Sequence, residues 1–187
     1  GSWLPGVPYT VAATFGYDGT GSTNTETASG AIVCTSFSPS TSGTVTQLSV
    51  QYRHDGANNF AFRTAIYADS AGEPTGTPIA GGQGDEVSVT GGGTAFRDSG
   101  GFSASVVGST TYHLCAWQSN GNGFLIYDTG GAAANQSEFD GGGTYPTWPS
   151  FTSDGSLTWR IHVVATYTEA GGGGRTSSKR ALLGVGK

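Results

Sequence analysis

Glu138 and Asp140 are two acidic residues close enough in sequence to suggest paired-carboxylate chemistry. A glycosidase uses one carboxyl group as an acid and a second as a base or nucleophile. Both residues lie in the same Gly-rich stretch, however, where acidic residues are also favoured as turn formers. The pair is a weak basis for an active site, so we expect no catalytic residue in this chain.

Other residues that could do chemistry lack the spacing that the chemistry requires. His54, His113 and His162 have no zinc-ligand spacing, and no Gly-x-Ser-x-Gly nucleophile motif occurs. Gly-rich runs that resemble nucleotide-binding loops precede no predicted helix. Several aspartates lie in Gly-rich turns, where carboxylates either bind a hard cation or simply form the turn: Asp18, Asp69, Asp85, Asp128, Asp140 and Asp154. We favour turns, and expect no metal, no cofactor and no enzymatic activity.

Aromatic residues in the second half of the chain could bind a ligand by stacking. Trp117, Tyr145 and Trp148 are candidates for a sugar-binding platform, because carbohydrates bind aromatic faces that have polar neighbours. Trp148, in the run Thr-Tyr-Pro-Thr-Trp-Pro, is the best candidate, although it could equally fill a loop. Trp159 alternates with Leu157 and Ile161 and is predicted to belong to the core.

The composition restricts the class of fold and of partner. The 187 residues include 33 glycines but few helix-forming residues, which predicts an all-β protein. The net charge is −5 and only 11 % of residues are charged, so we expect no nucleic-acid partner, which would require a clustered basic face. No run approaches the roughly 20 apolar residues of a membrane helix, so we expect no membrane partner.

Alternating runs predict where the strands of this domain lie. Residues 60–67 place Phe60, Phe62 and Ile66 on one face of a strand, and a turn-rich run follows them. Residues 44–52 and 157–167 alternate in the same way. Eight to ten such strands separated by turns predict an antiparallel β-sandwich spanning residues 11–168, with a jelly roll as the favoured topology.

The two cysteines, Cys34 and Cys115, lie in apolar strand-like runs. The favoured interpretation is two buried thiols that act as small hydrophobic residues. The alternative is a disulfide that joins two sheets and closes a loop of about 80 residues, which would contribute about 4 kcal/mol.

Both ends of the chain differ from the central domain. Residues 1–10 contain Pro5 and Pro8 and are predicted to form an extended arm, while residues 169–187 comprise a glycine linker and a basic, partly apolar tail. We expect these ends to make assembly contacts through the following residues: Trp3, Leu4, Val7, Tyr9, Arg175, Lys179, Arg180, Leu182, Leu183 and Val185.

Three segments together resemble a known group of jelly-roll modules. They read Thr44-Val-Thr-Gln-Leu-Ser-Val-Gln-Tyr52, Arg63-Thr-Ala-Ile-Tyr-Ala-Asp-Ser-Ala-Gly-Glu-Pro-Thr-Gly76 and Ser109-Thr-Thr-Tyr-His-Leu-Cys-Ala-Trp117. Over residues 44–167 the pattern is similar to modules of tailed-phage virion proteins and of bacterial extracellular proteins. The resemblance implies a structural or adhesive role and supplies no catalytic residues.

These observations lead to two hypotheses. The first is a non-enzymatic virion protein that decorates a capsid or forms part of a tail or fibre, assembling as a homo-oligomer and with other virion proteins. The second is a secreted carbohydrate-binding or adhesive module that binds surface glycans through Trp148, Tyr145 and Trp117.

Overall fold

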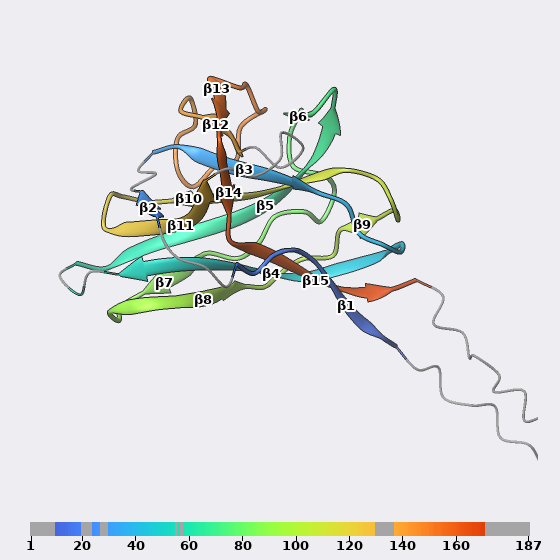
Figure 1. The fold of residues 1–187 in the computed structure, drawn as a ribbon, viewed down its shortest axis with the longest axis horizontal. Helices are drawn as coiled ribbons and strands as arrows, with labels where there is room; N and C mark the ends of the chain where they lie inside the picture. The colour runs from blue at the N-terminus through green and yellow to red at the C-terminus, as the bar shows by residue number, and fades with distance from the viewer. Residues whose placement is uncertain are drawn as a thin grey trace, which may run out of the picture.

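The computed structural model describes residues 10–19, 24–26, 30–54, 56, 58–129 and 137–170. These residues form two antiparallel β-sheets that pack as a sandwich, and no helix occurs among them (Figure 1). The prediction of an all-β antiparallel sandwich is therefore confirmed. All of the residues predicted to make assembly contacts lie outside the described ranges: Trp3, Leu4, Val7, Tyr9, Arg175, Lys179, Arg180, Leu182, Leu183 and Val185.

The first sheet is built around β4, which is its longest strand. Its described strands are β1 (Ala12–Tyr17), β2 (Asn24–Glu26), β4 (Gly43–His54), β8 (Gly93–Ser99), β9 (Ser105–Val106), β11 (Gly123–Thr129), β14 (Trp159–Ile161) and β15 (Val163–Glu169). Over residues 48–50, β4 pairs with β15 on one side and with β8 on the other. The C-terminal end of β4, residues 52–54, also pairs with β11. β1 completes one edge by pairing with β15.

The second sheet is centred on β10. Its described strands are β3 (Ile32–Phe37), β5 (Phe60–Ser70), β6 (Glu73–Thr75), β7 (Val87–Val89), β10 (Tyr112–Gln118), β12 (Ser137–Asp140) and β13 (Gly155–Leu157). β10 lies between β3 and β5, and β5 turns back into β6 as a hairpin.

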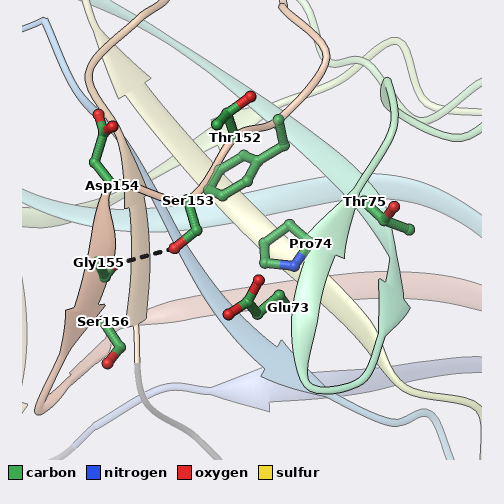
Figure 2. A pocket seen from close by; sticks show the side chains of 9 residues that line it. Glu73, Pro74, Thr75, Thr152, Ser153, Asp154, Gly155 and Ser156 are labelled. Carbon is green, nitrogen blue, oxygen red and sulfur yellow. Dashed lines mark hydrogen bonds between the residues drawn. The ribbon is translucent and has the colours of Figure 1, made fainter.

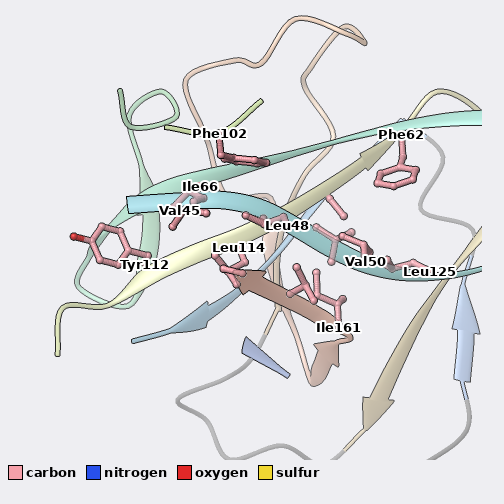
Figure 3. Close-up of a cluster of buried hydrophobic side chains, with 14 of the residues drawn as sticks. Val45, Leu48, Val50, Phe62, Ile66, Phe102, Tyr112, Leu114, Leu125 and Ile161 are labelled. Carbon is pink, nitrogen blue, oxygen red and sulfur yellow. The ribbon is translucent and has the colours of Figure 1, made fainter. Parts of the chain in front are cut away.

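The main core lies between the two sheets (Figure 3). β5 contributes Phe60, Phe62 and Ile66 to it, as their period-2 spacing predicted. β4 contributes Leu48, Val50 and Tyr52, which are almost completely buried. The opposite face of β5 is buried as well, because Ala65 and Tyr67 belong to a second apolar cluster on the outer side of the second sheet.

The structure differs from the predicted strands at two places. The run 157–167 is not one strand, because β13 joins the second sheet while β14 and β15 join the first. In β4 the alternation changes phase, so that Val45 is buried and Thr46 is exposed. The pairing register with β15 shifts at Thr166/Tyr167, and such an irregularity changes which side chains face the core.

Cys34 and Cys115 form a disulfide, so the preference for two free thiols is wrong. The bond also differs from the predicted alternative, because it joins neighbouring strands of one sheet rather than two sheets. Cys34 on β3 lies opposite Cys115 on β10, with their Cα atoms 4.0 Å apart. Both residues are fully buried in the second cluster.

Candidate binding sites on the second sheet

The three aromatic residues predicted to form a platform do lie together. The ring centroids of Trp117 and Trp148 are 5.4 Å apart, and those of Trp117 and Tyr145 are 5.3 Å apart. Trp117 is 0 % exposed, however, and Trp148 is 7 % exposed. Only Tyr145 keeps part of its ring at the surface. The prediction of an open stacking platform is therefore wrong for the two tryptophans, which pack as loop-filling core residues.

The loop of residues 141–154 buries these rings by folding over the outer face of the second sheet. Tyr67 on β5 lies edge-on to Trp148 and to Phe151 of this loop, with centroids 6.1 and 5.6 Å away. The Tyr67 hydroxyl donates a hydrogen bond to the Pro149 carbonyl at 3.0 Å. These contacts create a second small core outside the sandwich, because a strand with two apolar faces requires a covering layer on each side.

Two aspartates hold the covering loop in shape. The carboxylate of Asp140 accepts hydrogen bonds from the backbone N–H groups of Gly142 at 2.7 Å and Thr152 at 2.9 Å. Asp154 accepts one from Gly141 at 2.8 Å. Asp140 is almost fully buried and both of its oxygens accept backbone hydrogen bonds, so this carboxylate serves to hold the loop. The side chain of Glu138 lies outside the described part of the structure.

Each histidine is held by a different local partner. His113 Nε2 lies 2.8 Å from Asp69 Oδ1, and His162 Nδ1 lies 2.6 Å from Gln51 Oε1. His54 Nδ1 accepts a hydrogen bond from the Gly56 N–H at 2.8 Å. Within the described residues, no three His, Cys, Asp or Glu side chains cluster as metal ligands would. Nor does this part of the chain contain a helix with the length and hydropathy needed to cross a membrane.

A polar cluster on the first sheet was not predicted from the sequence. Tyr17 on β1 donates a hydrogen bond to Asp128 on β11, and the Arg160 guanidinium lies 3.6 Å from the centroid of the Tyr17 ring. His162 Nε2 is 3.4 Å from the other carboxylate oxygen of Asp128. The hydrogen bond to Asp128, followed by burial, raises the pKa of Tyr17. The cluster joins strands from both ends of the chain, which gives it a structural role.

An open cavity of about 660 Å³ lies beside the covering loop, between the β5–β6 hairpin and residues 151–156 (Figure 2). Its lining consists of Glu73, Pro74, Thr75, Phe151, Thr152, Ser153, Asp154, Gly155 and Ser156. Pro74 and Phe151 are buried and form an apolar floor, whereas the carboxylates of Glu73 and Asp154 are exposed. In Figure 2, Glu73 faces Ser153 and Ser156 across the cavity. This lining suits a ligand with a positive charge and an apolar stem.

Both predicted arms join the sandwich at the same edge. Ala12 on β1 lies opposite Thr168 on β15, and the Glu169 N–H donates a hydrogen bond to the Val11 carbonyl at 3.1 Å. Because these two strands are antiparallel, the residues that precede β1 and those that follow β15 begin side by side. The two arms are therefore covalently anchored at one place on the sandwich.

No protein-family model matches the chain, and no curated protein shows significant similarity to it.

Proposed function

We propose that this chain is a non-enzymatic structural protein of a virion, a capsid-decoration, tail or fibre subunit with a jelly-roll body. Its terminal arms attach the body to further copies of the chain and to other virion proteins. The observation that carries the proposal is the side-by-side origin of both arms at the β1–β15 edge. A body anchored at one edge can present its remaining surface outward while the arms bury apolar side chains on neighbouring subunits.

The rigidity of the body supports this role. Two apolar clusters and one buried disulfide hold the second sheet on both of its faces. Disulfides persist on virion surfaces and in secreted proteins, which are oxidising environments. The described histidines and the buried Asp140 serve the fold through local hydrogen bonds, which suits a structural protein.

The test compares the solution mass of four chains: the full sequence, a chain lacking residues 1–10, a chain lacking residues 171–187 and a chain lacking both segments. We expect a defined oligomer for the full chain, a smaller species when one arm is removed and a folded monomer when both are removed. Circular dichroism would show that each truncated chain retains its β structure. An unchanged mass after removal of both arms would contradict the proposal.

The second candidate function is a secreted carbohydrate-binding or adhesive module. The observation in its favour is the half-buried ring of Tyr145, whose hydroxyl donates a hydrogen bond to Glu86 at 2.7 Å. An aromatic ring can stack on a sugar while a neighbouring polar group fixes the orientation of the ligand. Screening the full chain and its Tyr145→Ala variant against a glycan panel would test this function. Binding that disappears in the variant would favour it, and no binding across the panel would exclude it for those glycans.

A further inference from the structure

Charge is divided unevenly along the chain. All thirteen acidic residues precede residue 171, whereas four of the eight basic residues follow it. Residues 1–170 therefore carry four basic and thirteen acidic side chains, a net charge of −9, and residues 171–187 carry +4. Both lysines, Lys179 and Lys187, are in the tail. Such opposite charges attract at close range and at moderate ionic strength.

The arginines of the body do not neutralise its acidic residues. Arg53 and Arg160 stack on the rings of Phe124 and Tyr17. Arg63 donates hydrogen bonds to the carbonyl oxygens of Pro146 at 2.8 Å and Gly84 at 3.3 Å. Arg97 donates one to the carbonyl oxygen of Gly91 at 3.4 Å. Among the described residues, ion pairs with carboxylates involve only His113 and His162. Glu73 is one of the exposed carboxylates that pair with no cation among the described residues.

The cavity beside the β5–β6 hairpin places the Glu73 carboxylate next to an apolar floor, whereas the Asp154 carboxylate at its border points away from Glu73 (Figure 2). Within the described residues, no hydrogen bond or ion pair engages the Glu73 carboxylate, and Asp154 uses one oxygen to bind Gly141. Pro74 and Phe151 are buried lining residues of the cavity. A lysine or arginine side chain fits this combination, because its methylene stem packs on apolar groups while its charged head meets a carboxylate.

We propose that this cavity binds the basic segment 175–180 of a neighbouring copy of the chain. The proposal rests on the assembly role argued above and names the surface on which the tail docks. The segment supplies three cations within six residues, namely Arg175, Lys179 and Arg180. Lys179 lies nine residues beyond Ala170, so an extended linker places it at most roughly 32 Å from Ala170, which is enough to reach an adjoining subunit.

The positions of the cavity and the tail origin favour a contact between copies. In Figure 1, β6 and β13, which border the cavity, lie at the top of the molecule, whereas β15 ends at the lower right. The end of β15, from which the tail begins, and the cavity that would bind the tail are therefore on different surfaces of the molecule. When the tail of one copy binds the cavity of the next copy, two different surfaces meet, and the interface is heterologous. Repetition of such an interface forms either a closed ring or an open filament.

A charge-exchange experiment on the full chain tests the proposal. We expect Glu73→Lys to weaken self-association about tenfold, measured from solution mass against concentration, without changing the unfolding temperature. A tail variant with Lys179→Glu and Arg180→Glu should weaken it similarly. Mixing the two variants should restore association, since each then supplies the charge that the other lacks. Asp18→Lys, at an exposed acidic residue away from the cavity, is the control of equal net charge.

The outcomes separate this proposal from the assembly role. If removal of residues 171–187 dissociates the oligomer but Glu73→Lys does not, the tail docks elsewhere and the cavity proposal is wrong. An equal loss in Glu73→Lys and Asp18→Lys would indicate a general charge effect and would also overturn it. Carbodiimide cross-linking of mixed heavy- and light-isotope chains provides a second readout. We expect Lys179 to be joined to Glu73 between chains, and a bond found only within one chain would overturn the neighbouring-copy assignment.

Discussion

Cys34 and Cys115 are bonded across β3 and β10, two adjacent strands of the second sheet, and the bond is covered by the side chains of the outer cluster. The two residues are 81 positions apart in sequence. A cross-link between such distant residues restricts the unfolded chain much more than the folded one. The disulfide therefore stabilises the sheet by limiting the conformations of the chain before it folds.

Replacing both cysteines by alanine should lower the free energy of unfolding by about 4 kcal/mol. The expected loss combines the greater entropy of the unfolded chain with the missing sulfur contacts beneath the covering loop. Urea unfolding followed by tryptophan fluorescence would measure it, and mass spectrometry of the wild-type chain before and after reduction would verify the bond. A transition midpoint equal to that of the wild type would show that the disulfide contributes nothing.

Trp148→Ala should destabilise the protein by about 3–5 kcal/mol, because it removes a large side chain from the packing against Tyr67 and Trp117. Thermal unfolding would measure the loss. Tyr145→Phe is the matched control: it keeps the ring and removes only the hydrogen bond to Glu86, so we expect a loss of about 1 kcal/mol or less. A Trp148→Ala variant of unchanged stability would contradict the loop-filling role.

The sequence predicted the sandwich because its strands have one face toward the main core. Period-2 alternation in β5 identifies Phe60, Phe62 and Ile66 without knowledge of any partner strand. The same logic fails for 157–167, where apolar residues continue to alternate while the chain crosses from one sheet to the other. Alternation records which face is buried, but it contains no information about the sheet to which a strand belongs.

The candidate site was harder to predict because its character depends on long-range burial. Trp117 and Trp148 have the residue types of a sugar platform, and only the fold of the 141–154 loop makes them core residues. That loop is fixed by backbone hydrogen bonds to Asp140 and Asp154, which in sequence resemble other turn aspartates. The disulfide likewise depends on the register of β3 against β10, which local spacing cannot specify.

Gly16→Ala should disrupt the edge from which the arms begin. Gly16 has a φ of +130°, and a Cβ atom there would lie 2.2 Å from the Val163 carbonyl oxygen on β15. Backbone strain and this clash together should cost at least about 2 kcal/mol. Hydrogen exchange of β1 and β15 would show whether their pairing is weakened. Gly91→Ala is the control, because a Cβ atom at Gly91 meets nothing within 4 Å, and we expect no loss of stability. Equal protection of β1 in both variants would contradict the prediction.

Alkaline pH should unfold the protein through its buried tyrosines. Burial raises the pKa of Tyr52 and Tyr67 above the usual value of 10.0, and burial followed by the hydrogen bond to Glu86 raises that of Tyr145. A raised native pKa means that the folded state favours the protonated phenol. The stability associated with these groups is therefore fully present below pH 10.0 and is lost as the pH rises above it, where the unfolded chain ionises first.

The near-ultraviolet absorbance of tyrosinate, recorded together with circular dichroism during a base titration, would test this expectation. Tyr52, Tyr67 and Tyr145 should ionise only as the β signal is lost. Tyr52→Phe should remove one tyrosine from the delayed step, since the phenyl ring fills the same buried site without an ionisable group. Ionisation of every tyrosine before any loss of β structure would show that the buried rings are accessible to solvent in the native protein.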